Sequence, residues 1–193
     1  MRHLRILFSS MVFAGVCLAG AGLGTAPDAA AAGAPIVASE EKVEAAYLHK
    51  FLNYAEWPPA VFPQADSPYV IGVAGDDTVA DELARIAAGR SVNNRGVVVK
   101  RLLPGDAINE LHVLFVGRGE RGRLAQWLRP AKGRPILTVT AADGALDLGS
   151  IINFRTVDDR VRFEVSVDAA EQSGIHLNSR LFSVATNVVK GNR

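Results

Sequence analysis

The sequence predicts a single α/β domain of three layers, in which helices cover both faces of a mostly parallel sheet. From residue 69 onward, short apolar segments typical of buried strands alternate with helical segments, as crossover connections between parallel strands require. Two later strand segments, residues 150–156 and 160–167, are separated by only three residues, so they form a C-terminal antiparallel hairpin. Because no linker-like stretch interrupts residues 41–190, we treat them as one domain.

The first residues have the order of a secretory signal peptide. Arg2 and Arg5 precede an apolar run over residues 6–23, and the small-residue stretch 29–34 offers several A-x-A cleavage sites. We therefore predict that residues 1–32 are removed on export. The alternative is an uncleaved membrane anchor, since the apolar run approaches the ~20 residues that span a bilayer.

The mature chain is expected to be nearly neutral. Removing Arg2, Arg5 and Asp28 with the leader takes 21 basic and 20 acidic residues to 19 of each. Such a balance lacks the basic face that binding to a phosphate backbone requires, so we expect no nucleic acid as a partner. The only cysteine, Cys17, lies in the leader, so the exported domain must be stabilised by its core rather than by disulfides.

The stretch 41–59 predicts an amphipathic helix at the start of the domain. Ser39 is placed to cap its N-terminus, where acidic side chains interact favourably with the helix dipole. Pro58 and Pro59 stop it, so the helix should end near Glu56 and leave Trp57 at its exit. Its apolar stripe at helical spacing consists of Val43, Ala46, Tyr47, Phe51 and Tyr54.

An alternation of strands and helices follows. Residues 69–74 are an apolar strand, after which Asp76, Asp77 and Thr78 supply an N-cap for a helix over residues 79–88. Three more strands and one short helix are expected, the strands at 97–102, 112–116 and 136–140 and the helix at 120–128.

The second hairpin strand alternates strictly between apolar and polar residues. Val161, Phe163 and Val165 alternate with Arg162 and Glu164. Successive side chains of a strand point to opposite faces, so the apolar set should face the core and the polar set the solvent.

A final helix is predicted over residues 177–190, after a helical turn at 168–173. Its apolar residues at helical spacing are Leu181, Val184, Ala185 and Val188. Docked on the sheet, it completes a Rossmann-like layering of helices and sheet. The core of this domain should include Ile71, Val73, Val113, Phe115, Leu137, Val139, Phe163 and Val165.

Several short motifs recur in the order and spacing of a known family. They begin with Ala45-Ala46-Tyr47-Leu48 and Phe51, followed by Glu56-Trp57-Pro58. Later in the chain come Ile71-Gly72-Val73, Leu114-Phe115-Val116, Leu137-Thr138-Val139, Arg162-Phe163-Glu164-Val165 and Ser173-Gly174. Over residues 43–188 the chain resembles the YfiR family of exported regulators.

The resemblance implies a periplasmic protein that binds the outward-facing domain of an inner-membrane signalling enzyme, typically a diguanylate cyclase, and holds it inactive. Such inhibition would limit cyclic-di-GMP and biofilm formation. In some systems an outer-membrane lipoprotein captures the regulator and relieves the restraint. Two further possibilities are kept. The protein could form a homodimer, and its alternative function is that of a periplasmic small-ligand sensor that acts with a membrane sensor kinase.

We expect the partner-binding surface on the hairpin and on the turn after it. Ile152 lies in the first hairpin strand, Glu164 on the outward register of the second, and Ala170 and Gln172 on the helical turn. A late hairpin often ends a parallel sheet, and an unpaired strand edge offers backbone groups to another chain. A further candidate is Trp57, as a partly exposed aromatic anchor at the helix exit.

Residues 117–122 form a G-x-G-x-x-G sequence after a strand, with Asp143 about twenty residues later, which is the spacing of a dinucleotide fingerprint. However, the strand comes late in the domain, and Glu120 would place an anion at the phosphate position. We therefore expect no dinucleotide and no other cofactor. Two alternatives stay open, a solvated basic helix start and a weak anion site at Arg118, Arg121 and Arg123.

Patterns for catalysis and for metal binding are weak. His49, His112 and His176 have no metal-ligand spacing within one helix. The sequence contains no G-x-S-x-G elbow, and Asp158-Asp159 lies where a hairpin turn uses aspartate for its backbone geometry. We therefore expect a protein that is not an enzyme and holds no metal.

Overall fold

The computed structural model describes residues 39–191, so the predicted signal peptide, residues 1–32, lies outside the described residues. The elements follow one another as α1 (Glu40–Phe51), β1 (Ala55–Glu56), η1 (Pro59–Val61), β2 (Tyr69–Ala74), α2 (Asp77–Ala87), β3 (Ser91–Val92), β4 (Arg95–Leu102), β5 (Val113–Val116), η2 (Arg118–Arg123), α3 (Leu124–Leu128), η3 (Arg129–Ala131), β6 (Leu137–Thr140), β7 (Ile152–Val157), β8 (Arg160–Ser166), α4 (Val167–Ser173), β9 (His176–Leu177), α5 (Ser179–Phe182) and β10 (Asn187–Val189).

Within residues 39–191, the main sheet has eight strands in the order β10-β8-β7-β6-β5-β2-β4-β3. Strands β4, β2, β5, β6 and β7 are parallel to their neighbours in this order, and β7 and β8 form the predicted antiparallel hairpin. Separately, β1 and β9 pair as a small antiparallel sheet. The predicted α/β fold with a mostly parallel sheet is confirmed.

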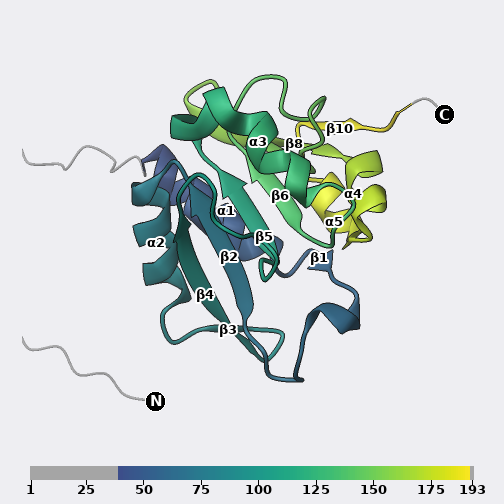
Figure 1. Cartoon of the computed structure of the whole chain (residues 1–193). Helices are drawn as coiled ribbons and strands as arrows, with labels where there is room; N and C mark the ends of the chain where they lie inside the picture. The colour runs from purple at the N-terminus through teal and green to yellow at the C-terminus, as the bar shows by residue number, and fades with distance from the viewer. Residues whose placement is uncertain (1–38, 192–193) are drawn as a thin grey trace, which may run out of the picture. The chain divides into compact units, whose positions relative to one another are not determined.

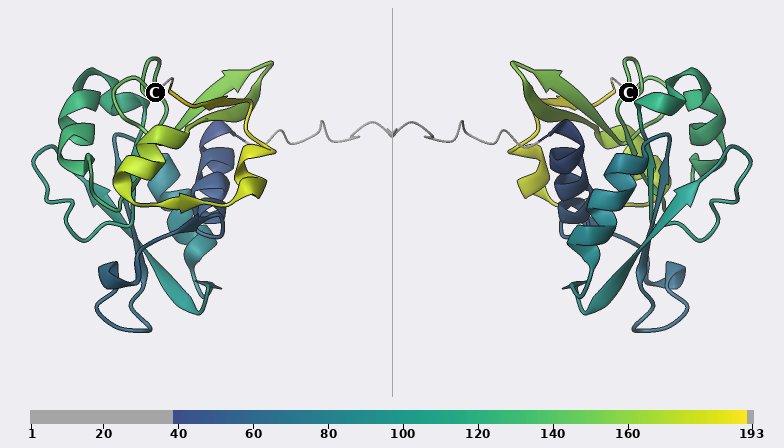
Figure 2. Two further views of the ribbon diagram at one scale, coloured as in Figure 1. Left: turned by 90° about the vertical axis from the view of Figure 1, so that its right-hand side faces the viewer. Right: turned by 90° about the vertical axis from the view of Figure 1, so that its left-hand side faces the viewer.

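Helices cover both faces of the main sheet, as Figures 1 and 2 show. Strand β5 illustrates this layering, because Val113 and Phe115 belong to the core beneath α1 and α2, whereas Leu114 and Val116 belong to the core beneath α3. A strand that buries both faces needs a continuous apolar run, which is what these residues supply. The predicted core is also confirmed, with all its members between 0% and 2% exposed: Ile71, Val73, Val113, Phe115, Leu137, Val139, Phe163 and Val165.

Turn residues set the two hairpins of the main sheet. Asn93 and Asn94 connect β3 to β4, and Asp158 and Asp159 connect β7 to β8, all four with φ between 48° and 63°. Asn and Asp tolerate this left-handed region better than other residues with a side chain. The sequence predicts the turn at Asp158 and Asp159 but not the two-residue strand β3.

The first helix is shorter than predicted, and its buried face is shifted from the predicted stripe. Of that stripe, Phe51 is buried, and Val43, Tyr47 and Tyr54 are half-buried against the core. Helix α1 ends at Phe51 rather than near Glu56, because the chain turns there and Ala55–Glu56 pair with β9. Ser39 has the extended conformation of an N-cap but makes no side-chain capping bond. The buried residues of the helix are Glu44, Ala45, Leu48 and Phe51, whereas Ala46 of the predicted stripe is exposed.

The predicted C-terminal helix over residues 177–190 is wrong. Only Ser179–Phe182 is helical, and the chain then extends as β10 alongside β8. Thr186 donates its backbone N–H to the carbonyl of Phe163 over 2.9 Å, which places the new strand in register. Two residues of the expected apolar stripe are exposed, Val184 at 60% and Val188 at 41%. Pairing satisfies the backbone of the β8 edge, and valine favours strands, so the extended form prevails.

Candidate functional site

Three of the five residues predicted to bind a partner are buried. Ile152 is 0% exposed and Ala170 is 3% exposed, and Trp57 is 8% exposed rather than a protruding anchor. The Trp57 indole Nε1 donates to the carbonyl of His112 over 3.1 Å, and its ring centroid lies 5.3 Å from that of Tyr69. These side chains therefore support the core, and the predicted surface needs correction.

The strand register explains why Ile152 points inward. It lies opposite Val165 across the hairpin, and both side chains belong to the core beneath α1. The hairpin also lacks the unpaired edge that we expected at β8, because β10 pairs there and places Asn187 beside Glu164. Of the predicted residues, half-buried Glu164 and exposed Gln172 are still open to solvent.

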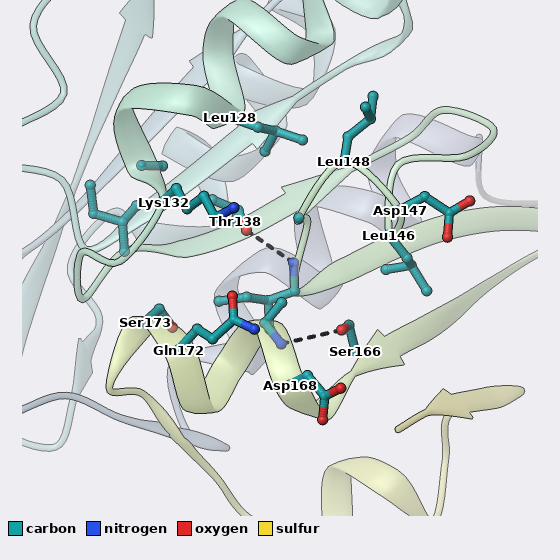
Figure 3. A pocket seen from close by; sticks show the side chains of 15 residues that line it. Leu128, Lys132, Thr138, Leu146, Asp147, Leu148, Ser166, Asp168, Gln172 and Ser173 are labelled. Carbon is teal, nitrogen blue, oxygen red and sulfur yellow. Dashed lines mark hydrogen bonds between the residues drawn. The ribbon is translucent and has the colours of Figure 1, made fainter. Parts of the chain in front are cut away.

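Gln172 lines a hollow of about 280 Å³ that we call the α4 groove, shown in Figure 3. It is bounded by α4, by the end of α3 with η3, and by the loop 146–149 between β6 and β7. Its labelled lining residues are Leu128, Lys132, Thr138, Leu146, Asp147, Leu148, Ser166, Asp168, Gln172 and Ser173.

Short-range hydrogen bonds hold the walls of the α4 groove. The Ser166 hydroxyl accepts from the backbone N–H of Ala169 over 3.3 Å and so caps α4, which Gly174 ends with a φ of 71°. At the floor, the backbone N–H of Ile151 donates to the Thr138 hydroxyl over 3.0 Å. The capping bond fixes the start of α4, and the bond at the floor ties the groove to the sheet.

The α4 groove combines an exposed apolar side chain with a polar rim. Leu148 is 51% exposed on the loop at one side of the groove, and Lys132, Asp147 and Asp168 are polar residues elsewhere in its lining. A second hollow of about 240 Å³ on the other side of the loop includes Glu164 and shares Asp147 with the first. The α4 groove thus presents both apolar and polar side chains to solvent, a mixture that protein-binding surfaces also have.

The G-x-G-x-x-G sequence serves packing between two loops. A side chain at Gly119 would place its Cβ 2.5 Å from the carbonyl oxygen of Gly75, and the backbone N–H of Gly119 donates to that oxygen over 3.2 Å. Glu120 is buried and accepts from Trp127 Nε1 over 2.9 Å and from Arg123 Nε over 2.7 Å, bonds that lower its pKa to about 2. A carboxylate therefore occupies the place where a phosphate would bind.

Comparison with known proteins decides the family. A family model described as YfiR/HmsC-like matches residues 41–186. The chain belongs to the YfiR/HmsC-like family. A search among curated proteins found no match. Membership confirms the resemblance inferred from the motifs and supports a regulatory function.

One feature of this YfiR/HmsC-like domain that we did not predict is a buried carboxylate in α1. Glu44 is 0% exposed, and its Oε1 accepts from Arg118 Nη1 over 2.9 Å. Arg118 Nη2 also bonds Glu40 Oε1 over 2.6 Å, so the arginine bridges two turns of α1 to η2. Burial raises the pKa of Glu44 to about 7, although Arg118 opposes the shift. The spacing of Glu44 with Leu48 and Phe51 could have revealed it, since i, i+4 and i+7 share one helix face.

Two histidines of this YfiR/HmsC-like domain are shielded from solvent, His112 being buried and His49 half-buried. His112 accepts the backbone N–H of Val70 at Nδ1 over 3.1 Å and stacks on Phe62 at 4.6 Å, and burial lowers its pKa to about 4. Burial also lowers the pKa of His49. Within residues 39–191, no group of His, Cys, Asp and Glu side chains could hold a metal ion. The helices of this same region are too short or too polar to cross a membrane.

Proposed function

We propose that this YfiR/HmsC-like protein is a periplasmic regulator that inhibits an inner-membrane signalling enzyme, a diguanylate cyclase, by binding its periplasmic domain. It thereby limits cyclic-di-GMP and biofilm formation. The family match over residues 41–186 is the observation that carries this proposal. The regulator acts by binding and needs no catalytic group or cofactor of its own.

The α4 groove is our candidate for the surface that binds the cyclase. Leu148 offers the partner an apolar contact, while Gln172 and Glu164 lie on either side of its loop and offer polar ones. Burial of an exposed leucine supplies affinity, and the surrounding polar groups supply orientation. An outer-membrane lipoprotein that covers the same groove would release the cyclase.

Export is the first testable part of the proposal. We expect the mature protein in the periplasmic fraction to begin within residues 29–34, because a basic start, an apolar run and a small-residue exit occur in that order. Mass spectrometry of the intact purified protein measures this directly. Membrane-bound protein that retains Met1 would overturn the assignment to the soluble periplasmic fraction.

The regulatory function is tested by deletion and complementation. Loss of the gene should raise cellular cyclic-di-GMP and biofilm mass, and the wild-type gene should restore both. The variant Leu148→Asp should fail to restore them, because a charge at the centre of an apolar contact weakens capture of the cyclase about tenfold or more. Glu164→Arg should act in the same direction if both hollows form one contact surface.

Leu103→Asp is the matched control for this experiment. Leu103 is 71% exposed in the loop after β4, outside the lining of the α4 groove, so its substitution should leave repression intact. Each of the surface substitutions should change the free energy of unfolding by less than ~0.5 kcal/mol, which thermal unfolding verifies. If deletion leaves cyclic-di-GMP unchanged, the cyclase assignment is wrong. If only Leu148→Asp and Glu164→Arg are silent, the α4 groove is the wrong surface.

A function as a small-ligand sensor acting with a membrane sensor kinase is the second candidate. It is favoured by a separate hollow of about 430 Å³ beside Arg118, at the carboxyl ends of the parallel strands. Deletion would then change the output of the kinase pathway while cyclic-di-GMP stays constant, which separates the two functions.

A further inference from the structure

The separate hollow beside Arg118, which we call the arginine pocket, lies at the carboxyl ends of β5 and β6 and beside β7. Its volume is about 430 Å³, and its lining residues are Arg118, Arg121, Ala141, Ala142, Asp143, Phe154, Arg155 and Thr156. Open α/β sheets bind ligands outside the carboxyl ends of their strands, next to the point where strand order reverses. Here that point lies between β2 and β5. After β2 the chain crosses to β4 on one side of it and then returns to β5 on its other side.

The crevice at the reversal point is itself closed. Gly119 contacts the Gly75 carbonyl there, and Glu120 fills the adjoining space with its buried side chain. Open volume is therefore found one strand further along, between the loop after β5 and strand β7. The arginine pocket is thus an open hollow directly beside the closed crevice, where a ligand displaced from β2 and β5 has room.

The arginine pocket presents guanidinium groups from two separate elements. Arg118 and Arg121 come from η2, and Arg155 comes from β7. Arg155 Nη1 bonds Asp143 Oδ1 over 2.6 Å, but the Asp143 side chain is 94% exposed, so this pair is weak and can exchange for a ligand. Arg121 has no ion-pair partner among residues 39–191.

We propose that the arginine pocket binds a small molecule carrying an oxyanion, a carboxylate or a phosphate group, between Arg118, Arg121 and Arg155. Arg121 and Arg155 can each bond such a group with two parallel N–H donors. Both Nη atoms of Arg118 already bond Glu44 and Glu40, so Arg118 contributes mainly its charge. Ala141, Ala142 and Phe154 supply an apolar wall for the rest of the molecule. Arg123, which we had grouped with Arg118 and Arg121 as an anion site, is instead paired with Glu120.

Binding in the arginine pocket should depend on the protonation of Glu44. The charged groups that face Glu44 are Arg118 from η2, Glu40 from its own helix and Asp76 from the loop before α2. Its second oxygen, Oε2, is buried without a hydrogen-bond partner in the described part of the chain. When Glu44 takes up a proton, Arg118 keeps only Glu40 as an anionic partner, so the positive potential in the pocket rises. Because the pKa of Glu44 is raised to about 7, anion affinity should increase as the pH falls from 8 to 6.

Titration calorimetry of the purified mature protein tests the site, with sulfate as the tetrahedral probe and malonate as the carboxylate probe. Sulfate stays a dianion from pH 6 to 8, so its own charge does not change. Arg121→Gln and Arg155→Gln should each weaken binding about tenfold, the effect of losing a charge-assisted hydrogen bond. Arg129→Gln, an exposed arginine of η3 outside the pocket, is the matched control and should bind as the wild type does.

The result also identifies the class of ligand. Preference for sulfate supports a phosphate-bearing ligand, and preference for malonate supports an organic acid. The site would be overturned if neither anion bound, or if Arg121→Gln and Arg155→Gln both bound with the affinity of the wild type. Arg118→Gln is not used, because it would leave Glu44 buried without its partner.

The link to Glu44 is tested with Glu44→Gln. The wild type should bind sulfate about fivefold more tightly at pH 6 than at pH 8, whereas Glu44→Gln should keep the tighter affinity at both. Pocket binding whose pH dependence survives in Glu44→Gln would refute the link. These measurements use no membrane partner, so they stand or fall separately from the cyclase assignment.

Discussion

Replacing Phe163 with alanine should lower the free energy of unfolding by about 3–5 kcal/mol. Phe163 is 1% exposed, and its ring centroid lies 5.2 Å from that of Phe51 and 5.4 Å from that of Tyr47, both on α1. Phe154 lies directly opposite it across the hairpin. Alanine would leave a cavity between helix and sheet that rigid aromatic rings cannot close.

Urea unfolding followed by circular dichroism measures this loss. Phe182→Ala is the matched control, since Phe182 is a half-buried phenylalanine of α5 at the margin of the same core and should cost clearly less. A loss below ~1 kcal/mol for Phe163→Ala would contradict the packing of α1 on the hairpin.

Replacing Glu44 with glutamine should stabilise the protein by up to about 3 kcal/mol at pH 8 and by little at pH 4.5. Burial raises the pKa of Glu44 from 4.5 in an exposed setting to about 7 in the folded protein. The folded state therefore holds this proton more tightly than the unfolded state does. The stability that the proton contributes is fully present below pH 4.5 and is lost as the pH rises through about 7. Glutamine is neutral throughout and can still accept from Arg118, so it avoids this loss.

Chemical unfolding of both proteins at pH 4.5 and pH 8 tests the prediction. Glu41→Gln removes one charge from the same helix without touching the buried network, and so controls for net charge. Lower stability of Glu44→Gln than of the wild type at pH 8 would show that the ion pair with Arg118 outweighs the cost of burying the carboxylate.

The parallel core was predictable because its strands bury both faces. Such strands need unbroken apolar runs, and the runs at β2, β5 and β6 have no competing interpretation at their short length. The hairpin was equally predictable. Only Asp158 and Asp159 separate its two strands, and two residues can form only a tight turn. In these segments the local pattern and the tertiary environment agree.

Prediction failed where pairing between distant segments decides the outcome. Leu181, Val184, Ala185 and Val188 have helical spacing, yet the open edge of β8 captures this segment as a strand. The sequence of residues 177–190 alone does not indicate that such an edge is available for pairing. The burial of Ile152 and Ala170 was missed for the same reason, because it depends on which distant segments pack against them. Leu148 and Gln172 are brought together by the fold from a loop without periodicity and a short helix, so no spacing rule joins them.

The pairing of β10 with β8 also bears on how the sheet is completed as the chain folds. Residues 187–189 come after every other strand of the sheet, so β8 has an unpaired edge until they arrive. An open edge next to buried valines is a template on which a second chain can add a strand. Pairing of β10 therefore moves the free edge of the sheet from the seven-residue β8 to a strand of three residues, and a very short edge strand is a poorer template for edge-to-edge aggregation.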